Sequence, residues 1–588
     1  MVIGDLALLS DCRTAALVTL DGSVVWWPGS RFDGPSAFSR LLDPDAGHFT
    51  IRPAGPADAR RAYLDGTLVL ETEHDTGAGT LRVTDALAFA PGARGHEIGL
   101  ETPGALVRVA EAVGGDVEVE VELVPRPEYG LAVPRLVREG GQVVTVGGPD
   151  RLFLADGGAL EPDGGSARGR LVLRAGERRA FVLRRGRPEP LDGEATLADT
   201  IEAWRSWSAM HGGYDGPYRD EVLHATLVVQ GLTYQPTGAV VAAASSSLPE
   251  VPGGTENWDY RYAWLRDASL IARALLAATC ADEAQRYFHW MTRAAVSCRD
   301  SGHVQIVFGA EGERMLEEAE LDHLEGFGGS RPVRIGNAAW RQRQHDVLGE
   351  VLDVALALGE DLELDDFSAA FLCQLADRAA EQWREPDAGV WERRDGDRRH
   401  TVSAVMCWVA LDRAVQLADA LGPHADAPRW GRARDEIREE VERRAWSERR
   451  GAYAGVLGED ELDAAVLLLP LVGFADAGEE RMARTIDAID QALGDGGLHR
   501  RLEGREDEGA FLPVTFWLAA CRALAGDVDA ARAAFERAAG CANDVGLLAE
   551  MADPATGEPR GNVPQALSHV GLITAARCLA EAAERAPA

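Results

Sequence analysis

The spacing of apolar residues changes near residue 195, and this change restricts the folds open to the chain. Before it, apolar and polar residues alternate in runs such as "ALVTL" and "VEVEVELV", separated by turn sequences such as "DGS" and "EGGQ". After it, apolar residues recur at helical spacing. The pattern therefore predicts a multidomain protein, with an N-terminal antiparallel β-sandwich followed by an all-α domain.

The length of the chain supports more than one domain. Single hydrophobic cores stop growing at roughly 250–300 residues, and this chain has 588. The segment "TLADTIEAWRSWSAMHGG" reads as a helix that ends at Gly212 and Gly213. We therefore predict a β-sandwich domain over residues 1–195, a helical linker over 196–216 and a helical domain over 217–588.

The helical domain is predicted to contain twelve amphipathic helices. No sequence period of 30–50 residues recurs as a helical solenoid requires, and a closed barrel of six helix pairs fits the same number of helices. The pattern alone leaves both architectures open, and it predicts no strands beyond the linker. The predicted helices span residues 218–235, 264–280, 282–297, 339–358, 365–383, 402–421, 429–444, 460–470, 477–493, 510–524, 528–539 and 564–584.

The charge of the chain restricts its partners and its location. There are 95 acidic and 60 basic residues, which gives a formal net charge of −35 and disfavours nucleic acid and anionic membrane surfaces as partners. The first residues, "MVIGDLALLSDCRTAALV", lack the basic start of a signal peptide, and no apolar run approaches the ~20 residues that span a bilayer. We expect a cytoplasmic protein with no membrane partner and leave homo-oligomers as a possibility.

The eight cysteines show no C-x-x-C spacing, and we predict neither a metal nor a cofactor.

One short segment carries an unusual density of aromatic and charged residues. In "NWDYRYAWLRDAS", residues 257–269, aromatic side chains alternate with polar ones just before a predicted helix. Alternation places the rings on one side of an extended segment, and apolar rings beside charged groups suit a pyranose, which has a C–H face and a rim of hydroxyl groups. On composition alone, the favoured interpretation is that these rings are core and that Asp267 is only a helix-start residue.

The same segment resembles the first signature of the bacterial glycoside hydrolase family 15 enzymes, which include glucoamylases, glucodextranases and trehalases. The likeness continues through "LALLSDCRTAALVTLDGSVVWW", "HLEGFGGSRPVRIGNAAWRQRQHDVLGEVLD", "GVWERR", "VMCWVALDRA", "FLPVTFWLAA" and "GLLAEMADPATGEPRGNVPQALSHVGLI". The resemblance implies a β-sandwich joined by a linker to an (α/α)6 barrel. It also implies a carbohydrate substrate and inverting hydrolysis of α-glucosidic bonds.

Inversion requires a protonated carboxyl beside the glycosidic oxygen and a carboxylate across the sugar ring. The two groups lie roughly 6.5–9.5 Å apart, which leaves room for the attacking water molecule next to the carboxylate. The resemblance implies that Glu392, in "GVWERR", is the general acid and that Glu550, in "GLLAEMADP", is the general base. It further implies substrate binding by a second group of residues. Arg266 and Asp267 would grip hydroxyl groups of the glucose unit at the −1 subsite, Trp258 and Trp264 would form walls, and Arg331, Asn337 and Trp391 would contribute further contacts.

Departures from the family pattern bear on the second half of the substrate. Arg399 and His400 follow the proposed acid and predict a cationic surface near the leaving group, unless they pair in solvent with acids such as Asp395 and Asp397.

Three functions stay open. The first is inverting hydrolysis of trehalose or a short α-glucoside. The second is a specialised-metabolism enzyme that uses the same carboxyl pair on a non-standard substrate, and the third is a non-catalytic carbohydrate-binding protein.

Overall fold

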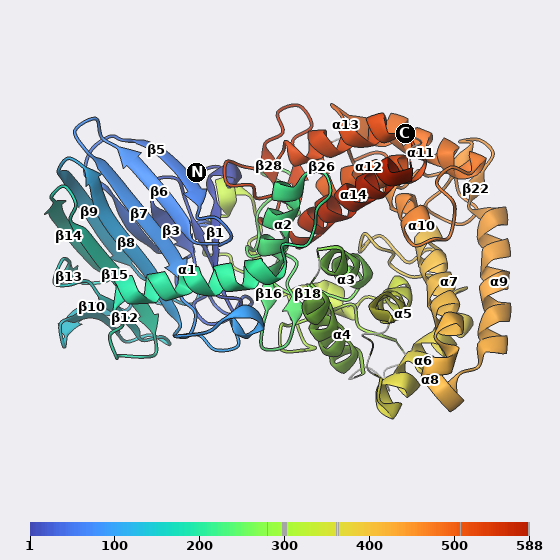
Figure 1. The fold of residues 1–588 in the computed structure, drawn as a ribbon, viewed down its shortest axis with the longest axis horizontal. Helices are drawn as coiled ribbons and strands as arrows, with labels where there is room; N and C mark the ends of the chain where they lie inside the picture. Colours follow the sequence, from blue (N-terminus) through green and yellow to red (C-terminus); the bar gives the residue numbers. More distant parts are fainter. Residues whose placement is uncertain (279, 297–302, 360–361, 363, 506, 586–588) are drawn as a thin grey trace.

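A β-sheet domain and a helical domain lie side by side along the long axis of the molecule (Figure 1). The computed structural model describes the chain except for residues 279, 297–302, 360–361, 363, 506 and 586–588. The long helix α1 (Gly193–Met210) lies along the β-sheet domain and leads into the helical one (Figure 1). The side chain of Asp192 accepts hydrogen bonds from the backbone N–H groups of Glu194 and Ala195, which explains why this helix begins where it does.

The N-terminal domain consists of two antiparallel sheets. One has seven strands in the order β1-β2-β3-β4-β9-β14-β13, and the other has eight in the order β10-β11-β12-β15-β8-β7-β6-β5. The strands of the first sheet are β1 (Ala7–Ser10), β2 (Ala15–Val18), β3 (Ser23–Trp26), β4 (His48–Pro53), β9 (Val117–Val124), β13 (Glu161–Asp163) and β14 (Ser166–Leu173). Those of the second are β5 (Asp58–Tyr63), β6 (Leu70–Asp75), β7 (Thr80–Leu87), β8 (Ala105–Gly114), β10 (Arg135–Glu139), β11 (Gln142–Val146), β12 (Leu152–Ala155) and β15 (Arg178–Arg185).

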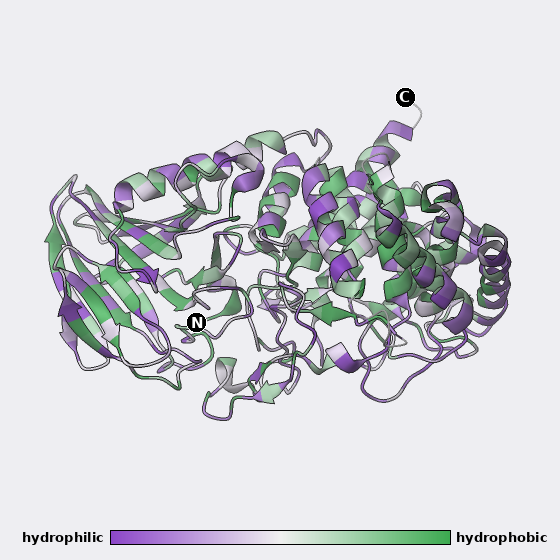
Figure 2. Cartoon of the chain, turned by 90° about the horizontal axis from the view of Figure 1, so that it is seen from below, coloured by the Kyte–Doolittle hydropathy of each residue, from purple (hydrophilic) through white to green (hydrophobic). Residues whose placement is uncertain are grey.

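Burial along β9 follows the alternation that predicted it. Val117, Val119 and Val121 are buried, whereas the glutamates between them are exposed or half-buried. In a strand successive side chains point to opposite faces, so one face of β9 contributes to the core. Hydrophobic residues run through the sheets and the inner helices, and hydrophilic ones line many loops (Figure 2).

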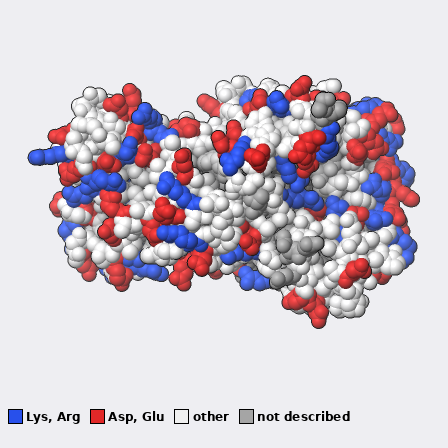
Figure 3. All heavy atoms as spheres, viewed as in Figure 1, with Lys and Arg blue, Asp and Glu red and all other residues white. Residues whose placement is uncertain are grey.

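The C-terminal domain is helical, and every predicted helical stretch overlaps an α-helix of the described chain. The helices are α2 (Arg219–Gly231), α3 (Ala268–Ala277), α4 (Ala281–Val296), α5 (Asp346–Leu358), α6 (Asp366–Gln382), α7 (Thr401–Gln416), α8 (Ala418–Leu421), α9 (Ala427–Arg444), α10 (Leu468–Leu471), α11 (Glu480–Leu493), α12 (Leu512–Leu524), α13 (Val528–Ala539) and α14 (Ala566–Arg585). The acidic and basic side chains are interspersed over the face drawn in Figure 3.

Two expectations for this domain were wrong. Short strands do occur beyond the linker, as two-residue ladders such as β18 (Ala263–Trp264) with β19 (Val307–Phe308) and β26 (Ala510–Phe511) with β27 (Met551–Ala552). Because β18 is extended, α3 begins at Ala268 and not at residue 264. The ladders pair residues in the loops between helices. A two-residue strand is too short to show the alternation of apolar and polar residues by which strands are predicted, so these strands were missed.

The start of the chain contacts the loop after α13 where the domains join. The Arg61 guanidinium, 1% exposed, donates to Asp544 Oδ1 at 2.7 Å. Asn543 Nδ2 donates to the backbone carbonyls of Gly4 and Leu6 at 3.1 and 2.8 Å. The segment that leads into β1, and Arg61 of β5, are therefore held by a loop that follows α13.

The seven cysteines that the structure describes are free and buried, while Cys298 lies outside the described residues. No single described helix is long and apolar enough to cross a bilayer. By length and composition alone, one bent pair of segments would pass that test, Thr401–Gln416 with Ala418–His424.

Candidate active site

A cavity inside the helical domain, here called the inner cavity, brings together side chains that are far apart in the sequence. Most of the residues that the family resemblance named are among them, together with acids and aromatic rings that it did not name. The lining includes Tyr260, Trp264, Arg266, Asp267, Asp346, Glu350, Val390, Trp391, Glu392, Arg501, Phe511, Trp517, Glu550 and Gln565.

Glu392 enters the inner cavity from the loop between α6 and α7. Its Oε1 accepts hydrogen bonds from Trp264 Nε1 at 2.5 Å and from Arg266 Nη1 at 2.7 Å. The backbone of Glu392 has φ = 56°, in the left-handed region that non-glycine residues seldom adopt. Such conformations concentrate at functional sites, where the surrounding structure holds them against their local cost.

Glu550 lies directly before β27 and is fixed by its own backbone. Its N–H donates to Asn562 O at 3.0 Å, and its carbonyl accepts from Leu512 N at 3.2 Å. The residue is 1% exposed, and its Oε2 has no hydrogen-bond partner among the described residues. An unpartnered buried carboxylate oxygen is costly unless a ligand or water molecule completes it.

Burial and the nearby charge of Glu250 raise the pKa of Glu550 well above its ordinary value, against the opposing effects of Arg501 and Tyr260. Arg501 donates to Glu250 Oε2 at 2.6 Å. The charge state of Glu550 therefore depends on Glu250 and Arg501 together.

Arg266 and Asp267 immediately precede α3, and their side chains contact each other through Nε and Oδ1 at 3.1 Å. Asp346 and Glu350, one helical turn apart on α5, line the same cavity, although we had not predicted them as site residues. Burial raises the pKa of Asp346 to about 6 and that of Glu350 well above its usual range. Three acids, Asp346, Glu350 and Asp353, on a largely apolar helix were the signal available in the sequence.

A second cavity, here called the outer cavity, shares Tyr260, Trp391, Glu392 and Arg501 with the inner one. Trp391 also donates from Nε1 to Asp463 Oδ1 at 2.7 Å. The rest of the lining is strongly charged. It includes Glu250, Glu256, Trp258, Arg334, Asn337, Arg393, Arg394, Asp395, Glu461, Glu503, Arg505 and Glu508.

Trp258 lies in the outer cavity, but cations cover its ring. The guanidinium groups of Arg334 and Arg394 lie 4.4 and 4.2 Å from its centroid. Glu318 accepts from Arg394 Nη2 at 3.0 Å and lies 3.7 Å from Arg334 Nε. Because these cations occupy the ring, Trp258 does not offer both of its faces for stacking on a sugar.

Three residues with expected roles lie elsewhere or act differently. Arg331 lines neither cavity and donates to the Glu325 carbonyl, whereas Arg334, three residues later, reaches the outer one. Arg399 pairs with Glu440 at 3.4 Å, outside both cavities. His400, the residue directly before α7, is buried. The outer cavity is therefore not lined by Arg399 or His400, and the predicted cationic surface formed by these two residues is absent from it.

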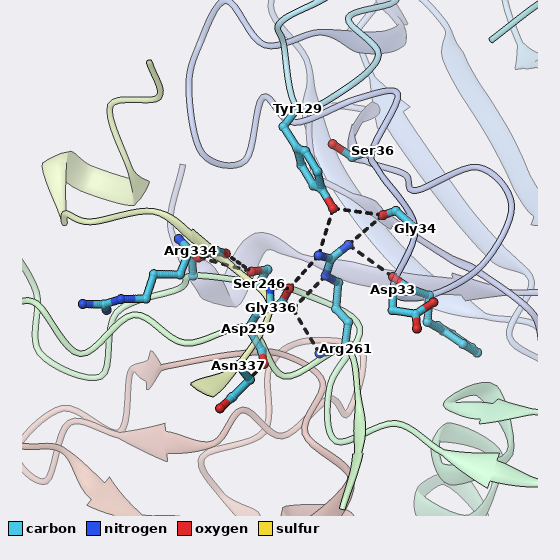
Figure 4. A network of polar contacts seen from close by, with 12 residues as sticks. Asp33, Gly34, Ser36, Tyr129, Ser246, Asp259, Arg261, Arg334, Gly336 and Asn337 are labelled. Atoms are coloured by element: carbon cyan, nitrogen blue, oxygen red, sulfur yellow. Dashed lines mark hydrogen bonds and ion pairs between the residues drawn. The ribbon is translucent and has the colours of Figure 1, made fainter. Parts of the chain in front are cut away.

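The alternating side chains of "NWDYRY" have two tasks. Trp258 and Tyr260 line the outer cavity, whereas Asp259 and Arg261 belong to the polar network drawn in Figure 4. Asp259 and Arg261 line neither cavity and pair at 2.7 Å, with both side chains fully buried. Arg261 also donates to Gly34 O at 2.8 Å and to the Tyr129 hydroxyl at 3.0 Å, which belong to the β-sheet domain. Asn337 joins the same group through a bond from Nδ2 to Asp259 O at 3.2 Å. One short segment therefore contributes to the cavities and connects the domains.

Comparisons with known proteins agree with this architecture. The family described as "Glycosyl hydrolases family 15" matches residues 216–577, and "Trehalase-like, N-terminal" matches residues 1–186. A protein named "Trehalase" from Mycolicibacterium smegmatis is 36% identical over 99% of this chain and 92% of its own length. One of the same name from Mycobacterium tuberculosis is 34% identical over 99% of this chain and 90% of its own length.

A solved structure shares the fold. The crystal structure of a bacterial glucoamylase complexed with acarbose superimposes with a TM-score of 0.73, covering 98% of this chain and 94% of its own, at 13% identity. At that identity the likeness concerns the fold alone. The family match over most of the helical domain and the relatives at 36% and 34% identity establish the family. The chain belongs to glycoside hydrolase family 15 and is a glycoside hydrolase.

Proposed function

We propose that the chain hydrolyses the α-glucosidic bond of trehalose with inversion of configuration. The observation that carries the proposal is the convergence of Glu392 and Glu550, from separate loops, on one cavity that also holds Arg266 and Asp267. We further infer that the helical domain is an (α/α)6 barrel and that this cavity is the −1 subsite.

In the proposed reaction Glu392 protonates the glycosidic oxygen while Glu550 removes a proton from the attacking water molecule. The C–O bond to the leaving sugar breaks as the C–O bond to water forms on the opposite face. The glucose attacked by water is released as the β-anomer, the leaving glucose keeps its α configuration, and the two carboxyls exchange their protonation states until solvent resets them.

Trehalose is favoured as the substrate by two observations. The relatives that match nearly the whole chain at 36% and 34% identity are named trehalases. The outer cavity that would receive the second sugar is lined by acidic and basic side chains, and the guanidinium groups of Arg334 and Arg394 cover its tryptophan, Trp258. Such a surface suits one compact, hydroxyl-rich ring better than a stacked chain of sugars.

One observation favours a second assignment of roles at the same site. Glu392 accepts from the Arg266 guanidinium at 2.7 Å, an environment that suits a carboxylate, whereas burial raises the pKa of Glu550. In the reversed assignment Glu550 would be the acid and Glu392 the base. The reaction catalysed would be the same.

An activated substrate separates the two assignments. Fluoride leaves α-glucosyl fluoride without protonation, so a variant that lacks the acid should hydrolyse it while losing trehalose turnover by about 10²–10⁴-fold. We expect Glu392→Gln to show this pattern. We expect Glu550→Ala to lose both activities and to regain turnover with azide, which replaces water and forms β-glucosyl azide. The opposite pattern would assign the acid to Glu550.

A substrate panel tests the remaining alternatives. Release of β-glucose from trehalose, maltose, isomaltose, kojibiose and dextran is measured by NMR for the wild type. Trehalose should be the best substrate. No release from any of them, with trehalose still bound, would favour a carbohydrate-binding protein, and no release and no binding would favour a non-standard substrate.

A further inference from the structure

Two histidines and a glutamate meet at the junction of the β-sheet domain, helix α1 and the helical domain. His96 lies in a short 3-10 helix (Gly95–Glu97) of the β-sheet domain, His211 directly follows α1, and Glu283 lies in the first turn of α4. They are distant in sequence and outside the lining of both active-site cavities. Only the folded chain brings these three segments together.

The potential ligand atoms of this group lie close together. One ring nitrogen of each histidine and one oxygen of Glu283 lie within 4.8 Å of one another. His96 Nδ1 is 2.7 Å from Glu283 Oε1, and His211 Nε2 is 3.6 Å from the same oxygen. Ligands at about 2.0–2.1 Å from a tetrahedral zinc ion are about 3.3 Å apart. Small side-chain shifts would therefore accommodate the ion.

The second nitrogen of His96 strengthens this interpretation. His96 Nε2 lies 2.8 Å from Asp282 Oδ2. A histidine that binds a metal typically donates its other N–H to a carboxylate, which fixes the tautomer. With the proton on Nε2, the lone pair of Nδ1 faces a carboxylate oxygen 2.7 Å away, and only a proton or a metal ion between them removes the repulsion.

Glu283 has capacity left for a cation. The side chain is 2% exposed, and its Oε2 has no hydrogen-bond partner within the described part of the chain. Trp207 Nε1 donates to Oε1 at 3.1 Å and holds the carboxylate in place.

We propose that His96, His211 and Glu283 form a zinc site that joins the two domains. Two imidazoles and a carboxylate match the ligand preference of Zn²⁺, and water or the second oxygen of Glu283 completes the coordination. His211 also lines a surface groove with Thr67, Trp207 and His224, which gives the ion a path of entry. The site is structural and separate from the proposed hydrolysis.

The test uses the full chain, stripped with EDTA and titrated with ZnCl₂ alone. We expect one Zn²⁺ to remain bound per chain after gel filtration, and Co²⁺ in its place to give the visible absorption of a tetrahedral site. His96→Gln should abolish this binding. Asp282→Asn changes an exposed side chain, which should leave folding intact, and should weaken affinity by about 10–100-fold through the tautomer of His96.

His48→Gln is the matched control, because His48 contacts Glu122 at 3.1 Å in a similar pair without a third ligand. This variant should bind zinc like the wild type. Binding without a defined stoichiometry, or binding that His96→Gln and Asp282→Asn leave unchanged, would overturn the proposal. In that case a proton on His96 would link Glu283 and Asp282.

Discussion

At the scale of single residues, the ionisation of Glu550 is coupled to that of Glu250. Burial is the main cause of its raised pKa, and the negative charge of Glu250 adds to it. Glu250 is itself buried and contacts Arg501 at 2.6 Å. Glutamine at position 250 keeps an oxygen for Arg501 and removes the charge.

Glu250→Gln should therefore lower the pKa of Glu550. If Glu550 is the base, it must be ionised, so the acidic limb of the pH profile of kcat/KM should move to lower pH. Glu317→Gln, on an exposed glutamate paired with Arg341, is the control and should leave the profile unchanged. Movement of the alkaline limb to lower pH would instead indicate that Glu550 is the acid. An unchanged profile would show that Glu250 does not influence Glu550.

At the scale of elements, two segments meet in the wall of the outer cavity: the loop between α6 and α7, which carries Arg394, and the segment before α3, which carries Trp258. The Arg394 guanidinium lies 4.2 Å from the Trp258 ring centroid, and its removal would expose one face of the indole. An exposed tryptophan face can stack on a further sugar ring.

Arg394→Gln should raise kcat/KM for maltotriose relative to trehalose. Kinetic constants for both sugars, measured side by side, check this expectation. Arg341→Gln is a close control, because Arg341 also lies over a tryptophan, Trp340, and pairs with a glutamate outside both cavities. If both variants changed the ratio of kcat/KM for maltotriose to that for trehalose equally, stacking of a sugar on the Trp258 ring would not explain the change.

Element types were predictable from the sequence, whereas the partners of surface arginines were not. Alternation in "VEVEVELV" and helical spacing after residue 217 reflect a buried face, which leaves a regular pattern. Arg331 and Arg334 both occur in one motif, and only the loop conformation decides which reaches the outer cavity. Asp346 and Glu350 escaped notice for a similar reason, because their importance comes from Arg266 and the cavity facing them.

At the scale of the whole molecule, Arg261 is a buried link between the domains. Removing one partner of a buried ion pair typically costs about 3–5 kcal/mol because the other charge stays buried. Arg261→Met leaves Asp259 without that partner and deletes the bonds to Gly34 and Tyr129. It should lower the midpoint of urea unfolding and also reduce trehalose turnover, since Tyr260 lies between the two paired residues.

A matched pair lies inside one domain. Arg108 and Asp85 are likewise buried and 2.7 Å apart, but both belong to the second sheet. Arg108→Met should destabilise the β-sheet domain with a smaller effect on turnover of the folded fraction. If Arg261→Met lost stability without losing turnover per folded molecule, the segment would connect the domains without positioning the site.

The contact between the first and last parts of the chain bears on the order in which the protein is made. Gly4, Leu6 and Arg61 leave the ribosome early, whereas Asn543 and Asp544, which bind them, are synthesised near the end. Until translation is almost complete, the carbonyl groups of Gly4 and Leu6 must therefore lack Asn543, and the charge of Arg61 must lack Asp544, although Arg61 can already donate to backbone carbonyls of its own domain. Nascent chains that stop before Asn543 should present this edge to chaperones, and chains released after it should not.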